Sequence, residues 1–363
     1  MTEVNKTRGC LLGMAIGDAY GAPTEFLQVD EILKRWPPNG PEKPLGMRRS
    51  SQYMLVEDLE ALKSFTSTNQ PIRVTDDTQM AISVGKALTQ CLHKGTIDQA
   101  GLEKTLREEF VEWYLSPENN RAPGNTCMGS CQGLLSKLPW MEATSPNSKG
   151  CGANMRVAPV GLLVTEKHVP DQKTRAAIAQ FQSAMTHAHP TALAASDLTA
   201  YAVTQFSKGV SPKDILDVLF AYAESQKGVY HVEWLDTLWQ RPGVESPMHF
   251  IARGWEDCLY VLERVRSSLV QPNREKDPCR FTGAGWIADE AFATGLLCFL
   301  LYSDEPTKAL QRAAVTSGDS DSIACLTGAF AGAYYGEEVW PQDWREAIEY
   351  RDVLLELAEG LAD

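Results

Sequence analysis

The chain has 363 residues, with 34 lysines and arginines against 47 aspartates and glutamates, so its formal net charge is −13. This charge argues against electrostatic binding to nucleic acid or to an anionic membrane. Hydrophobic residues make up 44% of the chain, which is enough to build a large folded core.

The nine cysteines include no C-x-x-C pair. This pattern is typical of buried thiols in a reducing compartment rather than of a disulfide framework. No stretch has the pattern of a signal peptide. No apolar run reaches the roughly 20 residues that a membrane-spanning helix needs. We therefore expect a cytoplasmic protein.

Apolar residues recur at helical intervals along the chain, whereas strand-like alternation is scarce. This spacing predicts helices over 79–88, 102–114, 191–206, 212–225, 288–302 and 344–361. Proline and glycine cluster in stretches that we expect to be loops, at 35–46, 117–124 and 241–247. No repeat of fixed period is visible. The sequence predicts one all-α domain that spans residues 1–363.

Two sets of glycines are spaced by four residues: Gly9, Gly13, Gly17 and Gly21, and then Gly328, Gly332 and Gly336. Each glycine inside a helix costs about 1 kcal/mol relative to alanine, so such a row needs a reason. Glycines on one face let a neighbouring backbone come close. If the two helices pack antiparallel, Asp18 and Glu25 lie near Asp319 and Asp321. The alternative is that both faces meet other core helices.

Two acidic segments stand almost a whole chain apart, Thr75-Asp76-Asp77-Thr78 and Asp319-Ser320-Asp321-Ser322. Each segment lies where a helix is expected to begin. Carboxylates flanked by hydroxyls are the hard oxygen ligands that Mg²⁺ or Mn²⁺ prefers. Asp and Thr are also good helix caps, but capping needs one such residue per helix, and several stand at both places.

Five motifs in this order resemble the ADP-ribosylglycohydrolase family, over about residues 8–336. The family includes the dinitrogenase reductase-activating glycohydrolase and the arginine- and serine-ADP-ribose hydrolases. The matching segments are 13–26 (GMAIGDAYGAPTEF), 75–78 (TDDT), 123–126 (PGNT), 148–159 (SKGCGANMRVAP) with 186–190 (THAHP), and 318–322 (GDSDS).

The resemblance implies an all-α, orthogonal multi-helix domain with two Mg²⁺ ions, or Mn²⁺ in their place. The ligands that it implies by position are Glu25, Thr75, Asp76, Asp77, Asp319, Asp321 and Ser322. It also makes Glu25, Asp76 and Asp77 the candidate catalytic residues, with Glu25 as a mobile ligand or acid/base. One departure from the family is Ser322, where threonine is commoner, but serine keeps the hydroxyl ligand.

Substrate-binding residues are also implied by the matching motifs. They are Gly124, Asn125, Thr126, Ser148, Gly150, Cys151, Gly152, Met155, Arg156 and His187. Glycines at 150 and 152 suit a pyrophosphate cradle, although a plain turn would use them too. Arg156 has an alternative role in a buried ion pair. The pair His187 and His189 is not expected to bind zinc, because no cysteine or third histidine lies nearby in sequence.

Trp286 and Glu290 precede a strongly apolar helix. The acid could simply cap that helix. Alternatively, the two residues contact a leaving guanidinium, since that group stacks on aromatic faces and pairs with carboxylates.

The function expected from these features is hydrolysis of ADP-ribose from a protein arginine side chain. The partner is then an ADP-ribosylated protein, and the role is either regulatory or immunity to an ADP-ribosylating toxin. Such a toxin could itself be bound through residues 35–51. The alternatives are a serine-linked or O-acetyl-ADP-ribose hydrolase, a metal-dependent phosphatase, and a non-catalytic ADP-ribose binder.

Overall fold

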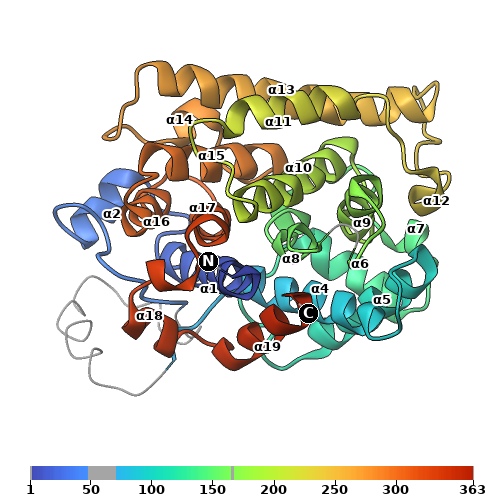
Figure 1. Cartoon of the computed structure of the whole chain (residues 1–363), viewed down its shortest axis with the longest axis horizontal. Coiled ribbons are helices and arrows are strands. Elements are labelled where there is room, and N and C mark those ends of the chain that lie inside the picture. Colours follow the sequence, from blue (N-terminus) through green and yellow to red (C-terminus); the bar gives the residue numbers. More distant parts are fainter. Residues whose placement is uncertain (1, 48–70, 165–166, 363) are drawn as a thin grey trace.

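The computed structural model describes residues 2–47, 71–164 and 167–362, and helices dominate these ranges. The N-terminal half holds α1 (Glu3–Gly21), α2 (Val29–Arg35), α4 (Asp76–Leu92), α5 (Gln99–Leu115), α6 (Asn125–Leu135), α7 (Trp140–Ala143), α8 (Ala158–Gly161) and α9 (Gln172–Ala184) (Figure 1). The remainder holds α10 (Pro190–Ser207), α11 (Ile215–Gln226), α12 (Val232–Leu235), α13 (Pro247–Val270), α14 (Cys279–Thr282), α15 (Ala288–Leu301), α16 (Pro306–Ala314), α17 (Ser320–Tyr335), α18 (Gln342–Ala347) and α19 (Arg351–Ala362). Extended pairing within the described ranges is limited to isolated bridges, so the predicted all-α class is confirmed.

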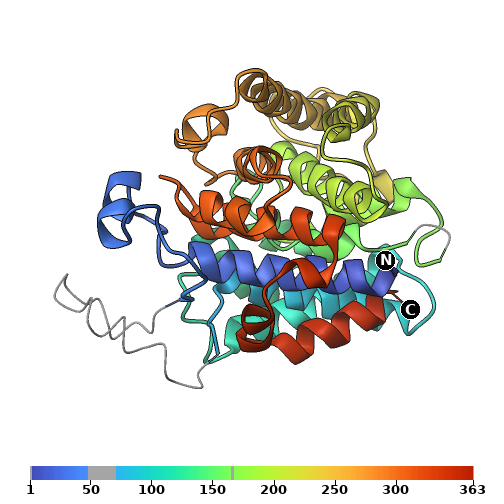
Figure 2. The same cartoon turned by 60° about the vertical axis from the view of Figure 1, so that its left-hand side comes forward.

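Helices α1 and α17 run side by side through the middle of the molecule (Figure 2). Their glycines bring the two backbones into direct contact. A Cβ atom added at Gly13 would lie 2.4 Å from the Gly328 carbonyl oxygen, and one added at Gly17 would lie 2.0 Å from the Ala324 carbonyl oxygen. At the end of α1, Gly21 meets the backbone of Ser320. The residue numbers run in opposite directions, which confirms the predicted antiparallel packing of the two glycine rows.

Other helices cover the central pair on every side. Helix α1 is buried around its whole circumference from Gly9 to Gly21, as expected for a helix without a polar face. Helices α10 and α15 pack against α17, while α4 and α19 pack against α1. Helices α11 and α13 form an outer layer over α10 and α15 (Figure 1). The end of α1 and the starts of α4 and α17, which carry the acidic residues, are therefore buried among other helices.

The predicted helix over 344–361 is divided in two by residues 348–350. Ile348 leaves the helix to pair with Ile72, and Tyr350 has a left-handed backbone with φ of 59°. Arg121 then pairs with Glu349. These contacts join segments far apart in the sequence, so local apolar spacing could not reveal them. The long helix α13 was also not predicted, although its apolar face is clear in the structure.

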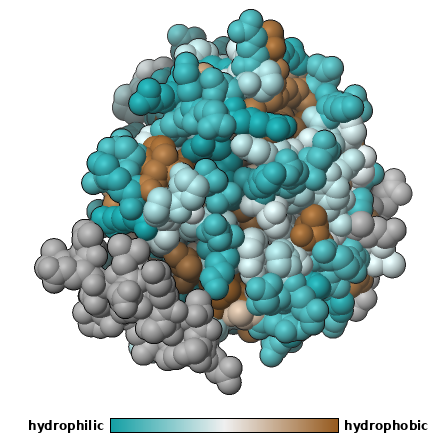
Figure 3. Space-filling view, turned by 90° about the vertical axis from the view of Figure 1, so that its left-hand side faces the viewer, coloured by the Kyte–Doolittle hydropathy of each residue, from teal (hydrophilic) through white to brown (hydrophobic). Residues whose placement is uncertain are grey.

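The face drawn in Figure 3 is mostly hydrophilic outside the grey atoms, and its apolar patches are separate from one another. All nine cysteines are free, which agrees with the expectation from their spacing. No helix in the described ranges is long and apolar enough to cross a membrane. The segment 35–51 lies partly outside the described residues, so the loop expected there is described only as far as residue 47.

Candidate metal centre and substrate site

The packing of α1 on α17 brings one glutamate to two aspartates. After α1 ends, the chain makes a tight turn in which the Thr24 hydroxyl donates to the Gly21 carbonyl and to Ser320 Oγ, at 2.8 and 3.1 Å. Glu25 follows in this turn. Carboxylate oxygens of Glu25, Asp319 and Asp321 all lie within 4.8 Å of one another. Residues almost 300 positions apart thus form one compact oxygen cluster.

The start of α4 adds two more aspartates. Thr75 caps this helix, because its hydroxyl accepts from the Asp77 N–H at 3.2 Å. Ser322 Oγ donates to Asp77 Oδ2 at 2.9 Å, which joins the start of α4 to the start of α17. Asp319 occupies the capping position of α17 but makes no capping hydrogen bond. Capping therefore accounts for Thr75 and leaves the aspartate side chains unexplained.

Burial raises the pKa of several of these carboxyl groups. Burial and the charge of Asp321 raise the pKa of Glu25 to about 11 and that of Asp76 to about 8. For the same reasons the pKa values of Asp77 and Asp319 lie well above the ordinary range. Within the described ranges, no lysine or arginine forms an ion pair with any of these acids.

The chemistry of these donor atoms decides whether the residues suit divalent cations. Buried acids repel one another unless protons or cations neutralise them. The donors at the centre of the site are carboxylate and hydroxyl oxygens, which is the chemistry that Mg²⁺ and Mn²⁺ prefer. The donor set therefore fits the expected metal ions.

Asp18 is buried, and the glycine spacing predicted its position near Asp319 and Asp321 but not its contacts. Its carboxylate accepts from the backbone N–H groups of Thr75 and Thr78, at 3.0 and 3.2 Å, and from the Thr78 hydroxyl. It thereby fixes the first turn of α4, where Asp76 and Asp77 stand. The available signal was its place one residue after Gly17, on a helix whose end was expected near the acidic site.

The glycine-containing loop 148–152 lies beside the acidic cluster. The Cys151 thiol donates to Asp319 Oδ2 at 2.8 Å. Ser148 Oγ and Thr126 Oγ1 lie 3.1 Å apart, which joins this loop to the start of α6. Gly124 and Asn125, at the same helix end, are exposed. A Cβ atom at Gly124 would meet nothing within 4 Å, so there is open space in front of it.

His187 lies directly beneath the loop. Its ring is close enough that a Cβ atom added at Gly150 or Gly152 would lie 3.3 or 3.0 Å from it. Nδ1 of the ring is hydrogen-bonded to Thr186 Oγ1 at 2.8 Å. Burial and the nearby Arg156 lower the pKa of His187 to about 3, so the imidazole is neutral at physiological pH. The neighbouring His189 caps α10.

Arg156 is completely buried. It donates to Gln182 Oε1 and Thr186 Oγ1, both at 2.9 Å, and its guanidinium stacks 4.4 Å from the centre of the Phe110 ring. The structure thus places Arg156 below His187, in the support of the loop. Met155 is also buried, against Ser322.

Trp286 and Glu290 are brought close to the site, but in different ways. The Trp286 side chain is 42% exposed, and its carbonyl accepts from the Cys151 N–H at 3.2 Å. Glu290 Oε2 accepts from the Ala284 N–H at 2.9 Å, so this carboxylate holds the loop that leads to Trp286. Glu290 therefore holds the loop with its side chain, whereas Trp286 contacts Cys151 through its backbone carbonyl and leaves its ring partly exposed.

Comparison with known proteins agrees with this geometry. The model of the family described as ADP-ribosylglycohydrolase matches residues 1–363. The ADP-ribosylhydrolase ARH3 of Gallus gallus is 27% identical, with 98% of this chain and 92% of the relative covered. The ADP-ribosylarginine hydrolase Tri1 of Serratia proteamaculans is 25% identical, with 99% and 79% covered. The ADP-ribosyl-[dinitrogen reductase] glycohydrolase of Rhodospirillum rubrum is 25% identical, with 96% and 91% covered.

A solved structure titled "ADP-ribosylglycohydrolase-related protein complex" has a TM-score of 0.64 and 22% identity, and the similarity covers 99% of this chain and 98% of the other. At this identity the likeness shows the fold alone. The family model, however, matches the whole chain. The chain is therefore a member of the ADP-ribosylglycohydrolase family.

Proposed function

We propose that this chain hydrolyses the N-glycosidic bond between ADP-ribose and a protein arginine side chain, using two Mg²⁺ ions, or Mn²⁺ in their place. The observation that carries the proposal is the buried cluster of carboxylates. Five acids from three distant segments converge, and no basic side chain in the described ranges neutralises them. Burying unpaired charge is costly, and bound divalent cations would neutralise these carboxylates.

The residues that would hold the ions are those at the starts of α4 and α17 and in the turn after α1: Glu25, Thr75, Asp76, Asp77, Asp319, Asp321 and Ser322. Divalent cations held there would help to orient the ribose hydroxyls and would make a nearby water more acidic. Asp18 keeps the first turn of α4 in place through its hydrogen bonds to the backbone.

Glu25 is our candidate for proton transfer. Without bound ions, burial and the neighbouring carboxylates raise its pKa to about 11; cations in the site would offset the repulsion and bring this pKa down towards the range of a proton-transfer group. A carboxyl group of this kind can give its proton to the leaving guanidino nitrogen as the C1″–N bond breaks. Water then forms the new bond to C1″ and loses a proton to a carboxylate, either Glu25 or Asp77. The sugar passes through an oxocarbenium-like state, as in other glycosidic hydrolysis.

The loop 148–152 is our candidate for the pyrophosphate. Backbone N–H groups near Gly150 and Gly152 can approach phosphate oxygens closely because neither residue has a side chain. His187 is neutral and buried directly beneath them, so it supports the loop without adding charge. Gly124 and Asn125 are exposed just before Thr126, whose hydroxyl lies 3.1 Å from the Ser148 hydroxyl of the loop.

Arginine is the acceptor that we favour, because the exposed ring of Trp286 at the rim can stack on a guanidinium. A serine-linked or O-acetyl-ADP-ribose substrate is the alternative on the same metal site. We place the activity in the cytoplasm, where it would reverse a regulatory modification or the action of an ADP-ribosylating toxin.

The test is to incubate the protein with an ADP-ribosyl-arginine peptide in Mg²⁺ and in EDTA, and to identify the products by mass spectrometry. The proposal expects free ADP-ribose and an unmodified peptide, in Mg²⁺ only. Release of AMP or phosphate would indicate a phosphohydrolase. Tight binding without turnover would indicate a non-catalytic binder.

A further inference from the structure

Two exposed aromatic rings stack at the edge of the acidic site. The ring centres of Phe26 and Trp286 lie 5.4 Å apart with 18° between their planes. Phe26 is 68% exposed and Trp286 is 42% exposed. The two residues are 260 positions apart in the chain, so only the tertiary fold creates this pair. Large apolar side chains held together at this exposure are typical of a binding surface.

Both rings are attached to segments that reach the carboxylate cluster. Phe26 follows Glu25 directly. Trp286 follows Gly285, where an added Cβ atom would lie 3.3 Å from the Cβ of Asp319. The Asp319 N–H also donates to the Ala284 carbonyl at 2.8 Å, which anchors the start of the same loop. The aromatic pair is therefore part of the rim around the candidate site.

Phe26 is held in an unfavourable backbone conformation. Its φ is 64°, in the left-handed region that bulky side chains rarely adopt. The turn is fixed by Thr24, which donates to Gly21 and to Ser320 Oγ. Such strain costs about 1–3 kcal/mol and is concentrated at functional sites. Burial does not offset this cost, because the Phe26 ring is mostly in solvent.

We propose that Phe26 determines acceptor specificity. Together with Trp286 it forms an aromatic wall that binds the planar guanidinium of the acceptor arginine. This inference rests on the proposed function and adds Phe26 to the acceptor site. The carboxylate of Glu290 already accepts from the Ala284 N–H, so the aromatic faces supply the larger part of the contact.

The physical reason is the attraction of a flat cation to an aromatic face. The same chain already uses this contact, since Arg266 lies 3.9 Å from the centre of the Phe220 ring. A serine acceptor carries no positive charge, so it gains nothing from this part of the contact.

The experiment compares kcat/KM for matched arginine- and serine-linked ADP-ribosyl peptides in wild type, Phe26→Leu and Phe26→Tyr. We expect Phe26→Leu to lower the value for the arginine-linked peptide about 5- to 30-fold more than that for the serine-linked peptide. Phe26→Tyr keeps an aromatic face and should restore the arginine-linked rate. An equal fall on both peptides would overturn the inference.

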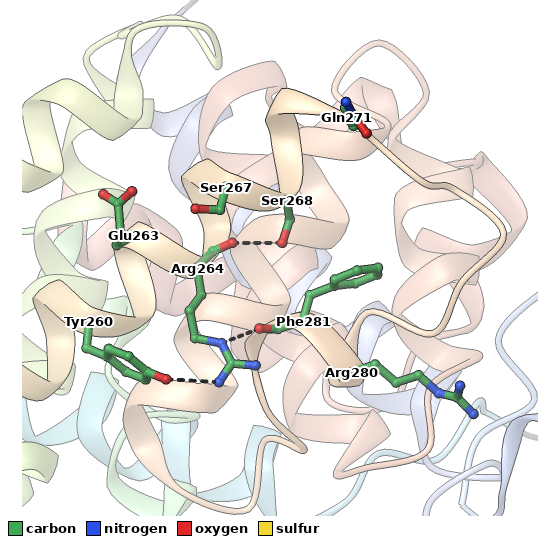
Figure 4. Close-up of a pocket in the computed structure, with 8 residues that line it drawn as sticks. All are labelled: Tyr260, Glu263, Arg264, Ser267, Ser268, Gln271, Arg280 and Phe281. Carbon is green, nitrogen blue, oxygen red and sulfur yellow. Dashed lines mark hydrogen bonds between the residues drawn. The ribbon is translucent and has the colours of Figure 1, made fainter.

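Tyr260→Leu is the matched control. Tyr260 is 63% exposed, and its hydroxyl accepts a hydrogen bond from Arg264 at 3.4 Å (Figure 4). Both residues line a pocket of about 380 Å³ between α13 and α14, and none of the residues that line this pocket belongs to the candidate site. This change removes an exposed ring elsewhere on the surface, so both peptides should be hydrolysed at wild-type rates.

A second readout does not depend on which peptide the enzyme prefers. Agmatine carries a guanidinium and should inhibit hydrolysis of whichever peptide is turned over. Phe26→Leu should raise its inhibition constant by a larger factor than that of free ADP-ribose. If wild type hydrolyses only the serine-linked peptide, the proposed arginine acceptor fails. An unchanged agmatine constant in Phe26→Leu would then reject the aromatic wall separately.

Discussion

Adding one methyl group at Gly17 should destabilise the protein, although the same change usually stabilises a helix. A Cβ atom at this position would lie 2.0 Å from the carbonyl oxygen of Ala324 on α17. Non-bonded heavy atoms settle about 3.5 Å apart, so α1 and α17 must separate by on the order of 1 Å. Over-packing of this kind costs about 1–3 kcal/mol, and because the contacted atom is backbone we take the upper end.

The helical preference of alanine over glycine returns about 1 kcal/mol. The net expectation for Gly17→Ala is therefore a loss of about 2 kcal/mol in the free energy of unfolding. The same separation moves Asp319 and Asp321 away from Glu25. A displacement of about 1 Å can reduce turnover about 100-fold, so activity should fall with stability.

Gly129→Ala is the matched control. Gly129 lies inside α6, and an added Cβ atom there would meet nothing within 4 Å. This variant should be more stable than wild type by about 0.5–1 kcal/mol. The assay is urea unfolding followed by circular dichroism. If Gly17→Ala is as stable as Gly129→Ala, the two helices are not in backbone contact and the account of the glycine rows is wrong.

Three further predictions concern the supports of the site and its charge. Asp18→Asn should weaken Mn²⁺ binding about 10- to 100-fold in calorimetry, because it alters the hydrogen bonds that hold α4; an unchanged affinity would exclude this role. Glu349→Gln should lower the unfolding free energy on the order of 3 kcal/mol in urea titration, because the Arg121 guanidinium is fully buried beside it; a loss below about 0.5 kcal/mol, typical of an exposed pair, would contradict this. In EDTA, the melting temperature should fall as the pH rises from 5.5 to 8. The raised pKa values of Glu25 and Asp76, about 11 and about 8, make the folded state bind more protons than the unfolded state in this range, so raising the pH removes stability. Adding Mg²⁺ should reduce this fall, and a melting temperature that rises with pH in EDTA would contradict the electrostatic argument.

The features that could be predicted from the sequence depend on local pattern or on repeated spacing. The glycines every four residues led correctly to the antiparallel contact of α1 and α17, and hence to Glu25 beside Asp319. The helix starts at Thr75 and Asp319 were also predicted correctly. Thr75 caps its helix, which is a local signal, whereas Asp319 occupies the capping position of α17 without a capping hydrogen bond.

The features that could not be predicted depend on contacts between distant segments. The break at Ile348 is stabilised by its pairing with Ile72, which no local pattern encodes. The stack of Phe26 on Trp286 likewise exists only in the folded chain. The hydrogen bond from the Ala284 N–H to Glu290 is a third example. It depends on the turn at Gly283, which brings the backbone against the Glu290 side chain. In the sequence, Glu290 looked like an unpaired acid near a tryptophan.

The most direct test of the metal assignment is the rate of ADP-ribose release by Asp77→Ala and Asp321→Ala, in saturating Mg²⁺ and with each variant's fold checked by circular dichroism. Asp352→Ala serves as the control, because the Asp352 side chain is 93% exposed at the start of α19. We predict that both cluster variants lose turnover by a factor of at least about 1,000, while the control keeps the wild-type rate. Near-wild-type hydrolysis by either cluster variant would contradict the two-metal account.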